Sequence, residues 1–237
     1  MKKIALSIIC LFFGQIFPQS NPDPSRFRYG RDGDEVYIDQ FINWDQKNTH
    51  TDNGILFVGS SSIRKWPTSK YFNYKSIINR GFGGSHISDV NHYFNSIVDK
   101  YIPKIIVLYG GDNDIAGNKA PEQVLEDYKE FSSLVSIKLP KAKIIFIPIK
   151  PSPARWSIWS KMRKANKLIE IYIDSDTAQF YVDTSTPMLN ENGKPSGDLF
   201  VSDSLHLSVK GYDIWSKILK PTLDSLVMKD RIKIFGW

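Results

Sequence analysis

The fold is decided at residues 55–62, which read ILFVGSSS, an apolar run followed by a glycine and three serines. A short run without alternating polar residues is typical of a strand buried on both faces of a parallel sheet. The same design recurs where residues 76–79 precede GFGGS (81–85) and where residues 105–109 precede GGDND (110–114). Function in such sheets collects at the carboxyl ends of the strands. These three loops are therefore the first place to look for a functional site.

The rest of the chain continues the alternation of strands and helices. Further strands are predicted at residues 144–149 and 180–182. Apolar residues that recur every three or four positions predict helices at 87–98, 124–135 and 162–172. Each crossover helix must return the chain to the same end of the sheet, so both faces of the sheet are covered. We expect the α/β class, a three-layer α/β/α sandwich with a mainly parallel five-stranded sheet.

A fourth segment, DSLH (203–206), places Asp203 three residues before His206 and just ahead of a predicted last helix at 207–227. An aspartate in that position can accept a hydrogen bond from Nδ1, which leaves Nε2 facing a serine hydroxyl. We expect Ser61 to be a nucleophile, His206 its general base and Asp203 the partner that orients the imidazole. On a rival interpretation the serines only cap a helix, and the aspartate and histidine form an ordinary surface pair.

The order of Ser61, Gly84, Asn113 and His206 along the chain resembles the four blocks of the SGNH family of serine esterases, also called GDSL hydrolases. The resemblance covers most of the chain and implies a flavodoxin-like SGNH hydrolase fold and an acyl-enzyme mechanism. It also implies an oxyanion hole made by the backbone N–H groups of Ser61 and Gly84 and the side-chain amide of Asn113. The chain departs from the family's Gly-Asp-Ser block because Ser60 stands in place of the aspartate.

Four side chains near these blocks are predicted to bind substrate. Arg64 follows the nucleophile by three residues, and Arg155, Trp156 and Trp159 come after the fourth strand. Loops at that end of the sheet would line the pocket, where the tryptophans could stack on a sugar or an acyl chain. Packing of the two tryptophans in the core is an equally good interpretation, since buried tryptophan is common.

Other ligands are less well matched by the sequence. The glycines at 81–85 could cradle a phosphate, but neither the dinucleotide spacing nor a Walker lysine is present. The acidic residues at 110–114 lack the other ligands of a calcium loop. His50, His86 and His92 are poorly spaced for a metal and are interpreted as surface or cap residues. No metal or cofactor is expected.

Composition indicates an ordinary globular chain. It has 237 residues, 41% of them hydrophobic, a formal net charge of +6 and a pI near 9.2. The richest basic run is interpreted as the solvated face of a helix; it comprises Lys161, Arg163, Lys164 and Lys167. No nucleic-acid motif accompanies these residues, so we do not expect nucleic-acid binding.

The N-terminus has the charged start and short apolar stretch of a secretory signal peptide, predicted at residues 1–20. The stretch is too short to span a bilayer comfortably, so no integral membrane segment is expected after cleavage. Cys10 follows Ile9 where a small residue would be needed, so lipid anchoring there is not expected. Residues 21–50 are predicted to be an N-terminal arm and residues 51–237 the hydrolase domain of a secreted or periplasmic protein.

Together these features predict a secreted serine esterase acting on a small-molecule or glycan ester. Short acyl groups on carbohydrate are favoured, because no long apolar lid is evident and two tryptophans could stack on sugar rings. Cleavage of lysophospholipids or other lipid esters is the alternative within the enzyme class. A non-catalytic glycan-binding module on the same fold is the alternative from another class. The oligomeric state is left open.

Overall fold

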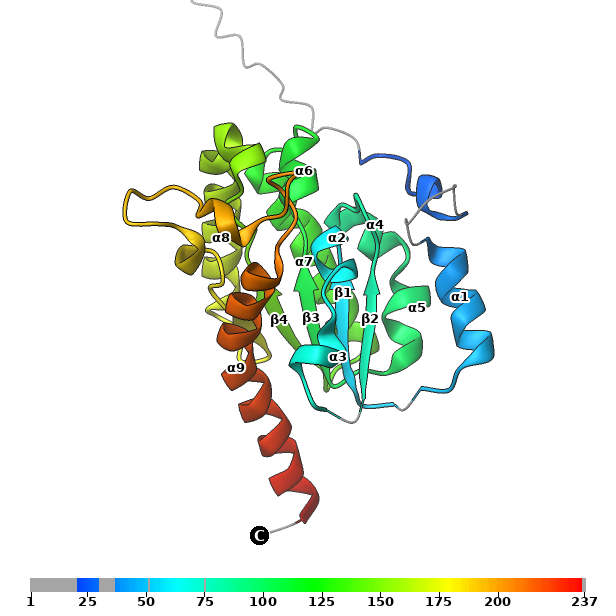
Figure 1. Cartoon of the computed structure of the whole chain (residues 1–237). Helices are drawn as coiled ribbons and strands as arrows, with labels where there is room; N and C mark the ends of the chain where they lie inside the picture. Colours follow the sequence, from blue (N-terminus) through cyan, green and yellow to red (C-terminus); the bar gives the residue numbers. More distant parts are fainter. Residues whose placement is uncertain (1–20, 30–36, 51, 75, 236–237) are drawn as a thin grey trace, which may run out of the picture.

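The computed structural model describes residues 21–29, 37–50, 52–74 and 76–235 (Figure 1). Its centre is a five-stranded parallel sheet with the strand order β2-β1-β3-β4-β5. The strands are β1 (Ile55–Gly59), β2 (Ile77–Gly81), β3 (Ile105–Tyr109), β4 (Lys143–Ile147) and β5 (Gln179–Tyr181). The predicted α/β class, the sandwich and the parallel sheet are confirmed. The signal peptide predicted at 1–20, with Cys10, lies outside the described residues.

Helices cover both faces of the sheet (Figure 1). One face packs against α4 (Ile87–His92), α5 (Phe94–Ile97), α7 (Pro121–Lys138) and α8 (Trp159–Ile173), with α1 (Ile38–Lys47) beside α5. The other face packs against α2 (Ser61–Arg64), α3 (Thr68–Tyr71) and α9 (Val209–Phe235). A short helix, α6 (Asp112–Ala116), follows β3. The 3-10 turns are η1 (Pro24–Phe27), η2 (Asp99–Tyr101), η3 (Pro153–Ile158), η4 (Thr186–Met188) and η5 (Gly197–Leu199).

The central strands β1, β3 and β4 are almost wholly apolar because both of their faces are buried, whereas the edge strands β2 and β5 are largely half-buried and carry polar residues. In β1, Leu56 and Val58 belong to the core under α4 and α7, whereas Ile55 and Phe57 belong to the core under α9. This alternation is the period of two that any strand imposes on its side chains. In a parallel sheet the strands also finish together: Gly59 of β1 pairs in register with Gly81 of β2 and with Tyr109 of β3. The loops after β1, β2 and β3 therefore start side by side.

Most predicted elements differ from the observed ones by a few residues at their ends, and three of these differences have a clear physical reason. The helix predicted at 87–98 is divided into α4 and α5 at Tyr93, whose backbone leaves helical geometry with φ −93° and ψ 11°. β4 ends at Ile147 because Pro148, which follows it, has no N–H to donate to a neighbouring strand. The last helix begins at Val209, and the hydroxyl of Ser208 caps it by accepting from the N–H of Gly211 at 3.3 Å.

The N-terminal arm packs against the rest of the molecule. The ring of Phe27 is buried with its centroid 5.0 Å from that of Phe82, in the loop after β2. Arg26 forms an ion pair with Asp89 of α4, and the hydroxyl of Tyr93 donates to the carbonyl of Pro24 at 2.8 Å. The arm thus braces the loop that carries the predicted oxyanion glycine. The helix α1 within residues 21–50 was not predicted from the sequence.

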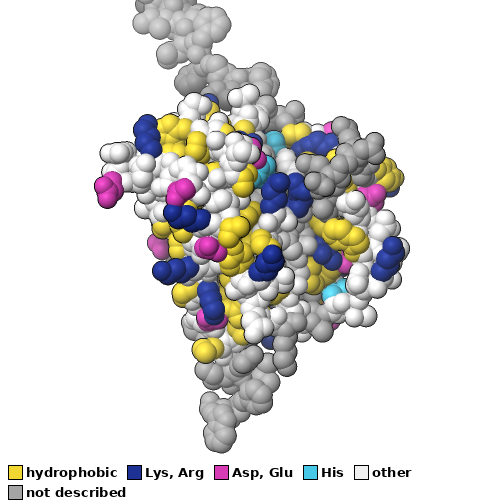
Figure 2. Space-filling view, in the orientation of Figure 1, with side chains coloured by type: hydrophobic (Ala, Val, Ile, Leu, Met, Phe, Trp, Pro, Cys, Tyr) yellow, Lys and Arg dark blue, Asp and Glu magenta, His cyan; other side chains and the backbone are white. Residues whose placement is uncertain are grey.

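Charged side chains are mixed on the visible surface. Figure 2 shows basic groups scattered among acidic and apolar ones, without a large field of one sign. The basic run on α8 is exposed, as the sequence predicts for a solvated face; it comprises Lys161, Arg163, Lys164 and Lys167. No helix in the described part of the chain is long and apolar enough to cross a membrane.

Candidate active site

The turn between β1 and α2 presents one of the three serines. Gly59 has φ +133°, and a Cβ there would lie 1.8 Å from the carbonyl oxygen of Tyr109, so only glycine fits. Ser60 and Ser62 are buried, and their hydroxyls have no hydrogen-bond partner among the described residues. Ser61 is half-buried and starts α2. The structure therefore distinguishes Ser61 from its neighbours by exposure as well as by position.

Ser61 meets the imidazole and carboxylate predicted for it. Its Oγ lies 2.9 Å from Nε2 of His206, and Nδ1 of that ring lies 2.6 Å from Oδ2 of Asp203. The other carboxylate oxygen of Asp203 accepts from the backbone N–H groups of Leu205 at 2.9 Å and His206 at 2.8 Å. Partial burial raises the pKa of Asp203, but these hydrogen bonds outweigh it and lower the pKa to about 2. The carboxylate is thus ionised near neutral pH and can hold His206 as an Nδ1–H tautomer.

Backbone contacts fix the loop that carries the imidazole. Phe200 and Leu207 pair as an isolated bridge at its base, just before α9. Ser204, at the tip, has φ +58°, a left-handed conformation that costs energy for a residue other than glycine. Its carbonyl accepts from the N–H of Ala154 in η3 at 3.1 Å. The loop is consequently tied both to the last helix and to the segment after β4.

The predicted oxyanion donors lie on adjacent loops. Gly84 has φ +76°, and a Cβ there would meet nothing within 4 Å, so its backbone borders open space. The Nδ2 of Asn113 donates to the carbonyl of Ser85 at 3.0 Å, which joins the loops after β2 and β3. Ser61 is the first residue of α2, where backbone N–H groups have no partner within their own helix. The three predicted donors therefore come from the segments after β1, β2 and β3, which start side by side.

A buried charge cluster that the sequence did not reveal lies behind Asn113. The carboxylate of Asp112 lies 3.0 Å from the ammonium of Lys150 and 3.3 Å from the guanidinium of Arg155. Tyr109 donates its hydroxyl to the same carboxylate at 3.0 Å. Burial raises the pKa of Asp112, but the positive charges of Lys150 and Arg155 lower it overall. The sequence does not indicate in which direction a long cationic side chain points after the end of a strand. No sequence signal could therefore have revealed this cluster.

Comparison with known proteins supplies the family. Residues 61–214 match the GDSL-like Lipase/Acylhydrolase family. The chain belongs to this family. The human platelet-activating factor acetylhydrolase IB subunit alpha2 is 28% identical over 210 residues, which cover 83% of this chain and 86% of the human one.

Two solved structures of the family's fold show the same architecture. A GDSL-like lipase from Bacteroides thetaiotaomicron superimposes with a TM-score of 0.68 at 21% identity, covering 79% of this chain and 97% of that one. A carbohydrate esterase family 3 protein from Talaromyces cellulolyticus gives a TM-score of 0.61 at 16% identity, covering 75% and 99%. At these identities the likeness shows the fold.

The departure of this GDSL-like acylhydrolase from the Gly-Asp-Ser block leaves hydrogen bonds of the turn between β1 and α2 in place. The backbone N–H of Ser60 donates to the carbonyl of Tyr109 at 3.1 Å, and its carbonyl accepts from the first turn of α2. The side chain of Ser60 is buried beneath the turn. The turn depends on the backbone at this position rather than on a carboxylate.

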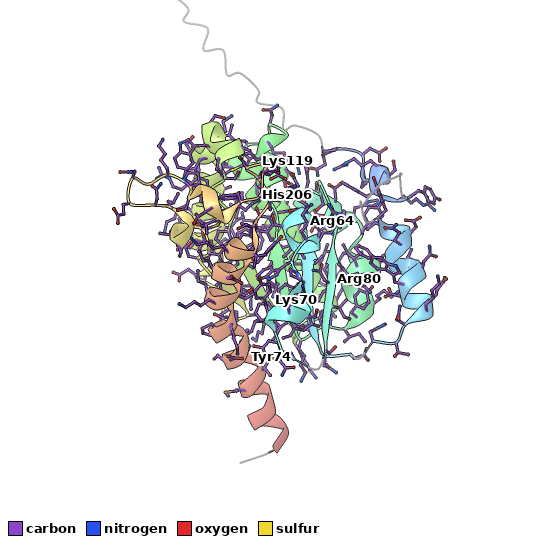
Figure 3. All side chains as sticks on the ribbon, viewed as in Figure 1. Arg64, Lys70, Tyr74, Arg80, Lys119 and His206 are labelled. Carbon is purple, nitrogen blue, oxygen red and sulfur yellow. The ribbon has the colours of Figure 1, made fainter. Side chains whose placement is uncertain are left out.

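The four predicted substrate-binding residues have different surroundings in this acylhydrolase. Arg64, the last residue of α2, is half-buried at the carboxyl end of the sheet (Figure 3). Arg155 already contacts Asp112 and the side-chain oxygen of Asn113, the latter at 3.0 Å. Trp159 is only 9% exposed and packs in the core, in agreement with the structural interpretation.

Trp156 has contacts over its ring from two sides. It stacks on Trp159 with ring centroids 6.1 Å apart, and the ammonium of Lys194 lies 4.8 Å from its centroid. Both tryptophans line a pocket of about 730 Å³ between α8 and residues 181–193, and this pocket does not include Ser61 or His206 in its lining. Stacking of a substrate on these two rings therefore stays a prediction.

The three histidines other than His206 cap a helix or pack against aromatic rings. His86 is the N-cap residue of α4 and is buried, and burial together with the charge of Lys119 lowers its pKa to about 4. His50 packs its ring against Tyr101, and His92 packs against Tyr93. Among the described residues, no group of three His, Cys, Asp or Glu side chains is placed to hold a metal ion.

Proposed function

We propose that this chain is a serine esterase in which Ser61 is the nucleophile, His206 the general base and Asp203 the residue that orients and stabilises the imidazole. The observation that carries the proposal is the unbroken series of contacts from Asp203 Oδ2 to His206 Nδ1 at 2.6 Å and from His206 Nε2 to Ser61 Oγ at 2.9 Å. These lengths are those of ordinary hydrogen bonds and need no rearrangement. Membership of an acylhydrolase family supports the ester as the bond that is cleaved.

In the first half-reaction Ser61 Oγ attacks the ester carbonyl while its proton passes to Nε2 of His206. The carbonyl oxygen becomes an oxyanion, which the backbone N–H groups of Ser61 and Gly84 and the amide of Asn113 stabilise. Collapse of this intermediate breaks the bond to the alcohol, and the imidazolium returns the proton to the departing alkoxide. Water then attacks the acyl-serine and loses a proton to His206. The bond between the acyl carbon and Ser61 Oγ breaks, the imidazolium returns its proton to Oγ, and the carboxylic acid is released.

We infer that the preferred acyl group is short and that the alcohol is part of a carbohydrate. Two relatives that share the fold support a short acyl group or a sugar: the human one is named an acetylhydrolase, and the fungal one a carbohydrate esterase. The signal peptide predicted at residues 1–20 supports secretion, and a secreted protein would have access to extracellular glycan esters. Stacking of the sugar on Trp156 and Trp159 stays a prediction; the two rings line a pocket whose lining does not include Ser61.

The test combines covalent labelling with a panel of substrates. A fluorophosphonate probe should modify Ser61, as peptide mapping would show, and Ser61→Ala should abolish labelling and lower kcat by about 10⁴-fold or more. Ser62→Ala is the matched control, because the Ser62 hydroxyl is buried away from His206. Nitrophenyl esters from acetyl to palmitoyl should be cleaved fastest at the short end, and acetylated xylo-oligosaccharide should be cleaved faster than acetylated phospholipid.

Each alternative has its own result in the same experiment. A maximum at long acyl chains would reject the short-acyl proposal and favour a lipolytic esterase. Absence of labelling and of turnover in the folded protein would reject the enzyme and favour a glycan-binding module. Full activity in Ser61→Ala with loss in Ser62→Ala would reject the assignment of the nucleophile.

A further inference from the structure

We propose that Arg155 is a positioning residue for the oxyanion hole: it orients the side-chain amide of Asn113 so that an N–H group, and not the carbonyl oxygen, faces the developing charge. The inference rests on the esterase function proposed above and names a group that acts through Asn113. From the sequence, Arg155 was predicted to bind substrate, so the two roles make different predictions.

The hydrogen bonds of Asn113 fix which way its amide points. The Nη2 of Arg155 lies 3.0 Å from Oδ1 of Asn113, and Nδ2 of Asn113 lies 3.0 Å from the carbonyl oxygen of Ser85. A guanidinium only donates and a backbone carbonyl only accepts, so both contacts select the same orientation of the amide. An amide nitrogen carries two hydrogens, and the contact with Ser85 uses one of them. The second remains for an oxyanion.

Buried charges hold Arg155 in place. Its Nη1 lies 3.3 Å from Oδ2 of Asp112, the residue before Asn113, and the same oxygen is 3.0 Å from Nζ of Lys150. The side chain of Lys150 is 1% exposed and that of Asp112 6% exposed, so solvent screens this cluster little. The two arms of one planar guanidinium therefore contact two consecutive residues, a geometry that the single ammonium group of a lysine does not reproduce.

The backbone around Arg155 is shaped for this contact. Arg155 departs from helical geometry inside η3, with φ −118° and ψ 20°. The N–H of the preceding residue, Ala154, donates to the carbonyl of Ser204 in the loop that carries the catalytic imidazole. The segment η3 thus contacts the oxyanion side of the site through Arg155 and the base side through Ala154. The guanidinium of Arg155 contacts protein acceptors on the oxyanion side. We therefore assign Arg155 a positioning role rather than a role in binding substrate.

The test is a double-mutant cycle on kcat with 4-nitrophenyl acetate and the full chain. Arg155→Lys keeps a cation beside Asp112, so the fold should be retained, but it loses the two-armed contact. Loss of one oxyanion donor costs about 10²–10³ in kcat, so we expect that range for Asn113→Ala and about tenfold for Arg155→Lys, with KM changed by less than about threefold. In the Asn113→Ala background, Arg155→Lys should change kcat by less than about twofold, because the amide it orients is absent. Arg163→Lys, on the exposed face of α8, is the matched control and should leave kcat unchanged.

The outcomes separate failure of this inference from failure of the proposed function. If the unmodified protein neither hydrolysed esters nor reacted with the probe, the proposed esterase function itself would be rejected. If the unmodified protein is active, three results would overturn the inference: unchanged kcat in Arg155→Lys, a change confined to KM, or equal losses with and without Asn113. Thermal unfolding of every variant identifies a general loss of structure, and Arg155→Gln, which removes the charge, provides a second variant if Arg155→Lys unfolds.

Discussion

Gly59 and Gly84 both have positive φ, but for different reasons. Substituting alanine for each should therefore affect stability and activity differently. Gly59→Ala would put a Cβ 1.8 Å from the carbonyl oxygen of Tyr109, far inside the 3.0 Å below which real contacts essentially do not occur, so β1 or β3 must move by about 1 Å. The φ of +133° adds strain of about 1–3 kcal/mol. Gly84→Ala meets no atom within 4 Å, and its φ of +76° costs about 1–2 kcal/mol.

We therefore expect Gly59→Ala to lower the free energy of unfolding by roughly 4 kcal/mol or more, since moving packed strands adds an overpacking cost of about 1–3 kcal/mol to the strain. Gly84→Ala should lower it by about 1–2 kcal/mol but reduce kcat/KM at least about tenfold, because relief of the strain turns the backbone N–H of residue 84 away from the oxyanion. Urea unfolding and hydrolysis of 4-nitrophenyl acetate measure the two quantities. Equal stability of the two variants would refute the steric argument, and full activity of Gly84→Ala would refute the role of its N–H.

Two further predictions concern buried charges. Lys119 is 1% exposed and lies 3.0 Å from Asp114 and 2.6 Å from Asp127. Lys119→Met should therefore lower the free energy of urea unfolding by about 3–5 kcal/mol, whereas Lys129→Met, at an exposed position, should lower it by under about 1 kcal/mol. Similar costs for the two variants would contradict the argument. His86, with its pKa lowered to about 4 by burial and Lys119, binds protons less readily when folded, so its contribution to stability is complete above pH 6.5 and is lost as pH falls toward 4. The stability of wild type relative to His86→Asn should accordingly fall by about 2 kcal/mol from pH 7.5 to 4.5, and a constant difference would count against it.

Comparing wild type with the His86 variant is necessary because a neighbour titrates in the opposite sense. Burial raises the pKa of Asp114 to about 6, so this carboxyl binds protons more readily in the folded chain. Its contribution to stability is therefore complete at low pH and is lost as pH rises from about 4 to 6. The two contributions to stability oppose each other in the unmodified protein. The difference in stability between wild type and His86→Asn isolates the contribution of His86.

The sheet was predictable because burial on both faces leaves a plain signal in the sequence. A strand such as β3, apolar at every position, has few alternatives once a glycine-rich loop follows it. The limits were less predictable: β4 is shortened by Pro148, and the break between α4 and α5 coincides with a tertiary hydrogen bond from Tyr93 to Pro24. Short-range periodicity does not report a contact with a distant segment.

The site residues also divide into features that the sequence pattern predicts and features that depend on contacts between distant segments. Ser61 and Asn113 each stand directly after a strand, and His206 precedes a helix with a clear apolar stripe, so their positions could be read from the chain. Their distances come only from the structure, as does the contact of Arg155 with Asn113. Long side chains such as Arg155 can reach several neighbours from one backbone position, and the pattern of residue types does not select among them. Docking of Phe27 on Phe82 was hidden for the same reason.

The position of β1 has a practical consequence for anyone producing this protein. The family match begins at residue 61, after β1 has ended, yet β1 is bonded to β2 on one side and to β3 on the other. A recombinant fragment cut at residue 61 would keep the Ser61 hydroxyl and discard the strand that lies between β2 and β3 in the sheet. The segment that matches the family is thus shorter than the segment that forms the sheet, and cloning limits should be chosen from the strand pairing.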